Sequence, residues 1–184
     1  MRRRNGMLPE EKTIRTKRIY EGKIINLRID EIELPGKKYA KREIVEHPGA
    51  VAIVPVTEDG EIIMVRQFRK AADMFLLEIP AGKLDKQEDP LSCAKRELKE
   101  ETGYEAQNIE RLCSFYSSPG FSNELIHIYI ATNLIRGEAS PDEDEYLSVE
   151  RYTIDQLLEM IRSGDLRDGK TIAGVMGAKL FLTR

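Results

Sequence analysis

The chain of 184 residues has the size of one domain, and 41% hydrophobic beside 33% charged residues is typical of a globular protein. Its formal charge of −3 gives no argument for nucleic acid as a partner, and no apolar run approaches the length of a membrane span. The basic start is followed by Asn5-Gly6 and Pro9 rather than an apolar stretch, so no secretory signal is expected. Cys93 and Cys113 are therefore expected as reduced thiols in the cytoplasm.

The first part of the chain predicts a small antiparallel sheet. Residues 1–12 are polar and interrupted by Pro and Gly, so a frayed N-terminus is expected there. Strand-like runs follow at 13–20, 23–34 and 38–46. Pro35-Gly36 is a turn signal between two of them. We therefore expect residues 13–47 to form an N-terminal β subdomain and residues 48–184 to form the main body.

More apolar strands and the helices follow after His47-Pro48-Gly49. The pattern predicts strands at 50–56, 61–67, 75–79, 109–117, 125–131 and 147–152. It predicts helices at about 90–102, from a Thr153 capping box through Ile161, and at 171–182. Glu58-Asp59-Gly60 predicts a tight hairpin between the first two strands. Strands and helices alternate without a regular βαβ repeat, so the fold class is α+β with a mixed sheet.

The helix at 90–102 carries a cluster of carboxylates. Glu97, Glu100 and Glu101 are three and four residues apart, so they share one helical face. Like charges on one face repel, and Mg²⁺ or Mn²⁺ would relieve the repulsion because both prefer oxygen ligands. The alternative is a solvated acidic face with Lys95 and Lys99 as counterions. Taken alone, the cluster favours this second interpretation.

The spacing around the helix changes that balance. The fixed positions run Gly82, five residues, Glu88, seven residues, Arg96-Glu97-Leu98, one residue, Glu100-Glu101, one residue, Gly103-Tyr104. Seven of these nine positions, counted as fixed at about 7% usage each, match a given start by chance roughly once in 10⁸. On these residues the chain resembles the Nudix hydrolases.

That resemblance implies an α/β/α sandwich with a mixed sheet and metal-dependent hydrolysis of a nucleoside diphosphate linked to another moiety. A pyrophosphate is strongly negative, so a divalent ion is needed to neutralise it and to activate water. The resemblance makes Glu97 and Glu101 the main ligands of Mg²⁺ or Mn²⁺, with Glu100 assisting and the Ala81 carbonyl as a further ligand. It gives Arg96 the role of holding a ligand carboxylate in place.

Three further features resemble the ADP-ribose pyrophosphatases within that family. They are Pro119, sixteen residues beyond Gly103, the segments 65–69 and 76–82, and the strand-rich residues before the main body. An ordinary Pro-Gly turn is the alternative explanation for Pro119. In such enzymes the N-terminal subdomain is exchanged between protomers, so the resemblance implies a homodimer.

The same resemblance assigns residues to the substrate. Arg69 would contact a phosphate, and Arg42 would reach the adenine or phosphate from the partner subunit. Glu78 would line the metal or terminal-ribose side, with Pro119 and Glu124 as further contacts. The alternatives are a surface arginine that closes a hairpin for Arg69 and a solvated strand residue for Arg42.

The acidic run at 139–146 offers a catalytic base. By sequence alone a solvated loop is its ordinary explanation. The resemblance implies instead that the loop closes over the pyrophosphate and supplies a glutamate that activates water. Glu143 is preferred over Glu145 because it falls nearer the start of the run, and Glu100 is the next candidate if neither serves.

The function expected from these features is cleavage of a nucleotide sugar, namely ADP-ribose to AMP and ribose 5-phosphate. One alternative is the same chemistry on another nucleotide sugar such as GDP-mannose. A second is a non-catalytic Nudix module that senses a nucleotide. The intact set Glu97, Glu100 and Glu101 argues against the sensor, because binding alone does not need a full metal cluster.

Overall fold

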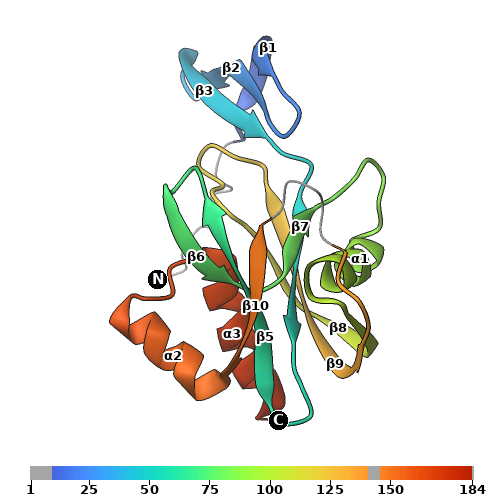
Figure 1. The fold of residues 1–184 in the computed structure, drawn as a ribbon. Helices are drawn as coiled ribbons and strands as arrows, with labels where there is room; N and C mark the ends of the chain where they lie inside the picture. Colours follow the sequence, from blue (N-terminus) through green and yellow to red (C-terminus); the bar gives the residue numbers. More distant parts are fainter. Residues whose placement is uncertain (1–9, 141–145, 184) are drawn as a thin grey trace, which may run out of the picture. The chain divides into compact units, whose positions relative to one another are not determined.

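The computed structural model describes residues 10–140 and 146–183, drawn in Figure 1. These residues divide into two compact units. The first unit comprises residues 10–47 together with Ser118–Glu124. The second comprises Pro48–Ser117 and the described residues from Leu125 onward.

The first unit is built on an antiparallel sheet in the order β1-β2-β3. Its strands are β1 (Lys12–Glu21), β2 (Asn26–Leu34) and β3 (Lys38–Glu46). The expected strand at 23–34 starts three residues late, because the Gly22 N–H donates to the Ile25 carbonyl over 3.0 Å and closes a turn there. At the predicted Pro35-Gly36 turn, Gly36 and Lys37 take φ of 80° and 58°, which reverses the chain.

The segment Ser118–Glu124 belongs to the same unit because it lies along β3. The Val45 N–H donates to the Phe121 carbonyl over 2.8 Å, and the Asn123 N–H donates to the Val45 carbonyl over 3.2 Å. The Asn123 Oδ1 also accepts from the His47 N–H at 2.8 Å. Residues more than 70 positions apart thus share one sheet edge.

The second unit contains two sheets and three helices (Figure 1). One sheet has the order β7-β4-β9-β8 and the other β10-β5-β6. The strands are β4 (Ala50–Pro55), β5 (Glu61–Arg69), β6 (Met74–Glu78), β7 (Ala81–Lys83), β8 (Tyr104–Tyr116), β9 (Leu125–Arg136) and β10 (Leu147–Thr153). The helices are α1 (Pro90–Thr102), α2 (Ile154–Ser163) and α3 (Gly169–Leu182). β4 and β9 are parallel and the other pairs antiparallel, so the expected mixed α+β class is confirmed.

The tight turn predicted at Glu58-Asp59-Gly60 is present. The Gly60 N–H donates to the Thr57 carbonyl over 3.0 Å, the Thr57 N–H donates to the Glu61 carbonyl over 2.9 Å, and an antiparallel bridge joins Val56 to Ile62. Beyond that bridge β4 and β5 enter different sheets. β9 pairs with one edge of β4 and β7 pairs with Ala50–Ala52 on the other, and β5 pairs with β6 and β10 instead.

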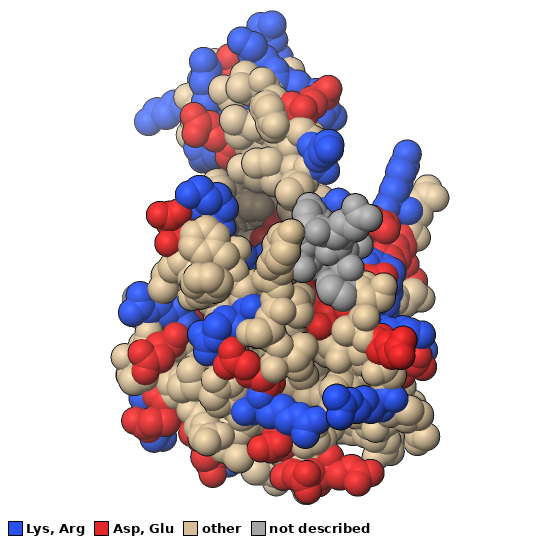
Figure 2. Space-filling model, in the orientation of Figure 1, with Lys and Arg blue, Asp and Glu red and all other residues tan. Residues whose placement is uncertain are grey.

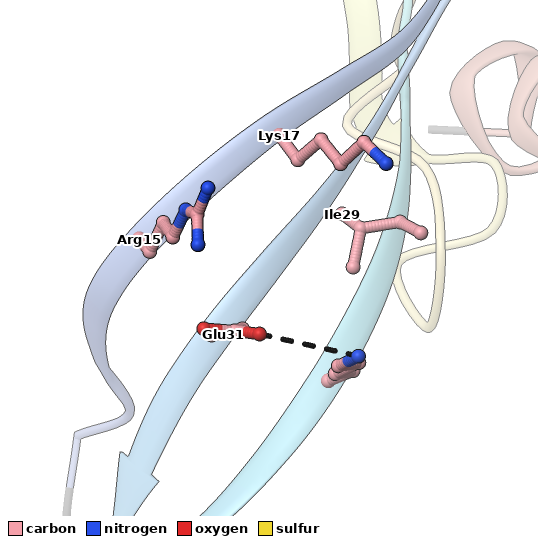
Figure 3. Close-up of a pocket in the computed structure, with 5 residues that line it drawn as sticks. Arg15, Lys17, Ile29 and Glu31 are labelled. Atoms are coloured by element: carbon pink, nitrogen blue, oxygen red, sulfur yellow. Dashed lines mark ion pairs between the residues drawn. The ribbon is translucent and has the colours of Figure 1, made fainter.

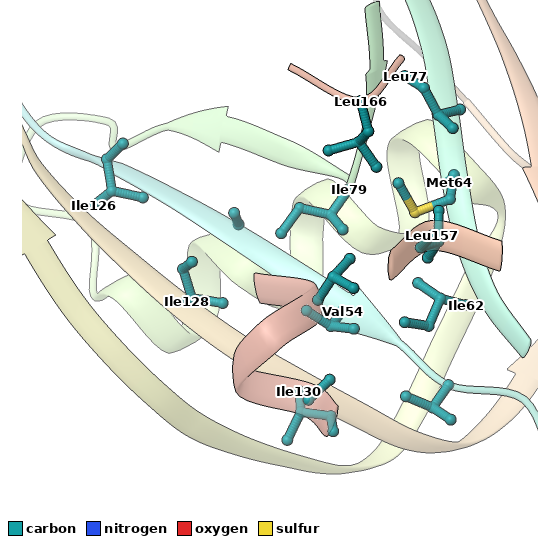
Figure 4. Packing of buried hydrophobic residues seen from close by; sticks show 14 residues of the cluster. Val54, Ile62, Met64, Leu77, Ile79, Ile126, Ile128, Ile130, Leu157 and Leu166 are labelled. Atoms are coloured by element: carbon teal, nitrogen blue, oxygen red, sulfur yellow. The ribbon is translucent and has the colours of Figure 1, made fainter. Parts of the chain in front are cut away.

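The core lies on both faces of β4, whose side chains alternate between two clusters. Val51 and Ile53 face the cluster under α1, which also contains Cys93, Ala94 and Leu98. Ala52 and Val54 face the larger cluster, shown in Figure 4, which joins α2, α3 and the second sheet through Ile62, Met64, Leu77, Leu157, Val175 and Ala178. A strand buried on both faces with helices on either side gives the α/β/α layering.

Local signals set the helix ends. The Asp89 carboxylate caps α1 by accepting from the Ser92 N–H at 3.1 Å, and Gly103 ends it with φ of 74°, as the sequence predicts. The Thr153 capping box of α2 is also present. The last helix begins at Gly169, two residues earlier than expected, because Asp168 caps it.

The second unit presents a mixed surface. Figure 2 shows basic and acidic side chains interspersed over its visible face rather than gathered by sign. Within the described part of the chain, none of the helices combines the length and hydropathy needed to cross a membrane.

Two glycines of α3 test how tightly this helix packs. A Cβ on Gly174 would lie 2.7 Å from Ile79 Cδ1 and 3.0 Å from Val54 Cγ2, whereas one on Gly177 would make an ordinary contact with Leu112 at 3.5 Å. We expect Gly177→Ala to raise the free energy of unfolding by about 0.5–1 kcal/mol through helix propensity. The free energy of unfolding of Gly174→Ala is expected to be about 1–3 kcal/mol lower than that of Gly177→Ala, because the added Cβ overpacks the core. Urea denaturation of both variants measures the difference, and equal stabilities would contradict close packing of α3.

Candidate active site

Arg96 on α1 is surrounded by three carboxylates. Its Nε and Nη2 donate to the two oxygens of Glu88, each over 3.0 Å. Its Nη1 donates to Glu97 Oε1 over 2.7 Å and to Glu100 Oε2 over 2.9 Å. Hydrogen bonding to Arg96 lowers the pKa of Glu88 to about 2, and the same pair raises the pKa of Arg96. The contact with Glu97 is the one that the resemblance implies for Arg96, and its catalytic role stays a prediction.

Glu97 and Glu101 converge on the backbone of β7. A Cβ on Gly82 would lie 1.8 Å from Glu97 Oε1, so only a residue without a side chain leaves room for this carboxylate. One turn further along α1, Glu101 Oε2 accepts from the Ala81 N–H over 3.0 Å. Both glutamates are buried, with exposed fractions of 8% and 2%. The structure therefore brings together Ala81, Glu97 and Glu101, the residues that the resemblance groups, and their role as metal ligands stays a prediction.

These residues fit a hard divalent cation by their donor chemistry. Carboxylate oxygens from successive turns of α1 meet a backbone loop, and oxygen donors of this kind are the ones that Mg²⁺ prefers. Among the residues that the structure describes, no three acidic, histidine or cysteine side chains are already arranged as a ligand set. Glu97 and Glu100 instead pair with Arg96 Nη1 at 2.7 and 2.9 Å.

A second network is centred on the buried Glu78 carboxylate, at the end of β6. Arg69 Nε and Nη2 donate to the two oxygens of Glu78, each over 2.7 Å, and Lys170 Nζ also donates to this carboxylate. Glu78 is 1% exposed. Burial on its own raises the pKa of Glu78, but Arg69 and Lys170 outweigh it and the pKa is lowered. The hydrogen bonds to Glu78 in turn raise the pKa of Arg69.

Sequence reasoning missed Lys170 and its neighbour Asp168. Lys170 lies in the first turn of α3, where the helix dipole disfavours a cation, and this unusual placement is the signal that could have found it. Its Nζ also contacts Asp168 Oδ2 at 3.0 Å.

The remaining predicted residues lie outside these networks. Arg42, Pro119 and Glu124 belong to the first unit, whereas Arg69, Glu78 and α1 belong to the second. Arg42 pairs with Glu11 in its own unit, with its Nε 3.0 Å from Glu11 Oε2, and Glu124 Oε1 lies 3.5 Å from His47 Nδ1. Their substrate roles stay predictions. Glu143 and Glu145 lie outside the described residues.

The sheet of the first unit carries a shallow hollow of about 280 Å³, shown in Figure 3. It is lined by Arg15, Lys17, Ile29, Glu31 and Lys41, and the Glu31 and Lys41 side chains pair at 3.9 Å. None of the predicted site residues lines it.

Comparison with known proteins decides the family. The NUDIX domain matches residues 46–174 of the chain. The chain belongs to the NUDIX family. Members of this family typically depend on a divalent metal ion. The Gly82–Tyr104 box, with α1 at its centre, is therefore the Nudix motif that the sequence predicts.

Two relatives match nearly the whole chain. A methanol dehydrogenase activator of Bacillus methanolicus is 47% identical over 95% of this chain and 96% of its own length. An ADP-ribose pyrophosphatase of Bacillus subtilis is 45% identical over 93% of this chain and 94% of its own length. A crystal structure of an ADP compounds hydrolase superposes with a TM-score of 0.85 at 20% identity and covers 96% of both chains, which confirms the expected fold.

Gly82 provides a direct test of this Nudix site. We expect Gly82→Ala to push the Glu97 carboxylate away from the loop and to lower kcat by about 10²-fold, because a misplaced ligand weakens charge stabilisation of the transition state. Gly177→Ala is the matched control, since its Cβ meets only ordinary contacts. Steady-state kinetics with Mg²⁺ measure kcat of both variants, and thermal melting measures their stability. The two measurements separate displacement of Glu97 from a loss of folding. Full turnover in Gly82→Ala would contradict the close approach of Glu97.

Proposed function

We propose that this Nudix protein hydrolyses the pyrophosphate bond of a nucleoside diphosphate sugar, with ADP-ribose giving AMP and ribose 5-phosphate. The observation that carries the proposal is the convergence of Glu97 and Glu101 on the backbone of Ala81 and Gly82. The 45% identity to the ADP-ribose pyrophosphatase of B. subtilis supports ADP-ribose as the substrate.

In the proposed reaction Glu97, Glu101 and the Ala81 carbonyl hold Mg²⁺ or Mn²⁺, with Glu100 assisting. When bound, the ion supplies charge neutralisation of the pyrophosphate and a lowered pKa for the attacking water. Arg96 keeps Glu97 and Glu100 oriented through charge-assisted hydrogen bonds.

Arg69 is proposed to bind a substrate phosphate. Two of its nitrogens are occupied by Glu78, and the side chain is 41% exposed. In the described part of the chain, no hydrogen bond is found for its Nη1. A guanidinium held on one edge and open on the other suits a phosphate oxygen. Glu78 then serves by fixing Arg69 rather than by lining the ribose directly.

The general base is proposed to come from the segment between β9 and β10, with Glu143 preferred over Glu145. A metal-bound carboxylate is a poor proton acceptor, so a base from outside α1 is preferred. Positioned general bases contribute roughly 10²–10⁴-fold to the rate.

The active protein is proposed to be a cytoplasmic homodimer in which residues 13–47 are exchanged between protomers and residues 48–184 form the catalytic domain. Exposed apolar side chains on the first unit's strands support this, since a three-stranded sheet cannot bury them alone: Ile14, Ile19, Tyr20 and Tyr39. Arg42 would reach the partner's substrate, with Pro119 and Glu124 beside it. Light scattering that gives a fully active monomer near 21.0 kDa would contradict the dimer.

Substrate and metal dependence are tested together. We expect phosphate release, coupled to a phosphomonoesterase, to be fastest with ADP-ribose in a panel of nucleoside diphosphate sugars that includes GDP-mannose. Glu101→Gln is expected to lower kcat by at least about 10²-fold at saturating Mg²⁺, because it loses a ligand charge. If GDP-mannose is hydrolysed fastest, it replaces ADP-ribose as the proposed substrate. Nucleotide binding without hydrolysis would indicate a sensor. Near-normal turnover of Glu101→Gln would contradict the metal assignment.

The loop glutamates are separated by paired variants. We expect Glu143→Gln to lower kcat by about 10²–10⁴-fold with KM for ADP-ribose nearly unchanged, because the base acts in the chemical step. Glu145→Gln serves as the matched control, and its kcat is expected to decrease less than that of Glu143→Gln. If only Glu145→Gln loses turnover, the two roles are exchanged. If both keep it, the base is sought at Glu100.

A second candidate function is activation of a methanol dehydrogenase. It is favoured by the 47% identity to the B. methanolicus activator over 95% of this chain. The test compares methanol oxidation by a purified methanol dehydrogenase with and without the wild-type chain. Including Glu101→Gln shows whether any activation needs hydrolysis, and an unchanged oxidation rate with the wild-type chain rejects this candidate.

A further inference from the structure

The start of α3 is tied to the strand end that leads into the Nudix box. Thr171 is fully buried, and its Oγ1 accepts from the Ile79 N–H over 3.0 Å. Asp168 Oδ2 in turn accepts from the Thr171 N–H at 3.0 Å and from the Thr171 Oγ1 at 2.5 Å. One residue earlier than Ile79, the Glu78 carboxylate accepts from Lys170. The segment Asp168–Thr171 therefore fixes both the backbone and the carboxylate at the end of β6.

Lys170 is placed where a lysine is costly. It lies in the first turn of α3, near the positive end of the helix dipole, and its side chain is only 13% exposed. A buried ammonium is tolerated only when it is well paired, and Lys170 contacts both Glu78 and Asp168. A simple helix cap does not need this cation, since Asp168 already caps α3.

The Glu78 carboxylate links Lys170 to Arg69. Its Oε2 accepts from both Arg69 Nη2 and Lys170 Nζ, while its Oε1 accepts from Arg69 Nε. The terminal torsion of a glutamate is broad, so the hydrogen bond from Lys170 adds a restraint on the carboxylate that does not depend on Arg69. Rotation of the carboxylate would carry the Arg69 guanidinium with it, because Nε and Nη2 are bonded to Glu78, and would move the edge that carries Nη1.

We propose that Lys170 is a positioning residue for the active site, which fixes the orientation of Arg69 through the shared Glu78 carboxylate. The inference rests on the proposed function for the contact between Arg69 and a substrate phosphate. The orientation of Arg69 itself does not depend on which substrate is cleaved.

Kinetics test the coupling between the two cations. We expect Lys170→Met to raise KM for ADP-ribose about tenfold or more with kcat changed less than about threefold, as for the loss of a charge-assisted hydrogen bond. Lys170→Arg should recover most of the lost affinity. In an Arg69→Met background, Lys170→Met should have little further effect on KM. A purely structural Lys170 would give the same fold-change in both backgrounds, and that result would overturn the inference.

Lys179→Met is the matched control on the same helix. Lys179 pairs with Asp155 at 3.2 Å on the surface and lies outside the network. The Lys179→Met variant is expected to leave KM for ADP-ribose unchanged. Thermal melting of Lys170→Met and Lys179→Met shows whether folding is affected. Equal kinetics for the Met variants at positions 170 and 179 would reject a positioning role.

A substrate-independent measurement separates this inference from the proposed function. The Nε–H of Arg69, bonded to Glu78, should exchange slowly with solvent in ¹⁵N NMR spectra of the wild type and faster in Lys170→Met. The Nε–H of Arg66, bonded to Glu150 at 2.6 Å, is the internal reference and should not change. If the wild type cleaves no nucleotide sugar, the proposed function fails while this measurement still decides the inference. An unchanged Arg69 signal in Lys170→Met would overturn it.

Discussion

Two carboxylates of α1, Glu97 and Glu101, are buried against the backbone of Ala81 and Gly82. The packing of the second unit around α1 and β7 depends on this contact. A buried carboxylate is costly unless it is hydrogen-bonded or paired. The Ala81 N–H and the Arg96 guanidinium provide those partners. On the adjacent face, buried apolar side chains of α1 pack against β4 and hold the helix close enough for the contact: Cys93, Ala94 and Leu98.

The loop that receives these carboxylates is fixed from three directions. α3 holds the Ile79 N–H through Thr171, β4 holds the Pro80 carbonyl through the Ile53 N–H at 2.8 Å, and α1 holds the Ala81 N–H through Glu101. Consecutive backbone groups are thus bonded to different elements of the core. Catalytic groups have to be held to a fraction of an ångström, and a loop bonded in this way meets that requirement through packing of the whole unit.

How much of this the sequence predicts depends on whether the signal is local. The ends of α1 were predictable because Asp89 and Gly103 act within one turn of the helix, and the box residues follow from fixed spacing. The separation of β4 and β5 into different sheets after the turn at 58–60 was not, because the pairing of β4 with β9 joins residues far apart in the chain. β7 has only three residues, too few for any periodicity. Lys170 contacts a carboxylate 92 positions away, which no local pattern reveals.

The charges of the site divide into two parts with different consequences. Around α1 a single guanidinium, that of Arg96, faces Glu88, Glu97 and Glu100, so negative charge is left over where a divalent ion is proposed. Around Glu78 two cations, Arg69 and Lys170, meet one buried carboxylate and Asp168, so the charges balance there. Arg69 can then offer an open edge to a phosphate without strong repulsion from the cation-binding side, since Glu101 also stabilises its charge. The proposed substrate, a metal-bound pyrophosphate, carries both signs and would complement this division. Its cation would match the acidic part, and its oxygens would match Arg69.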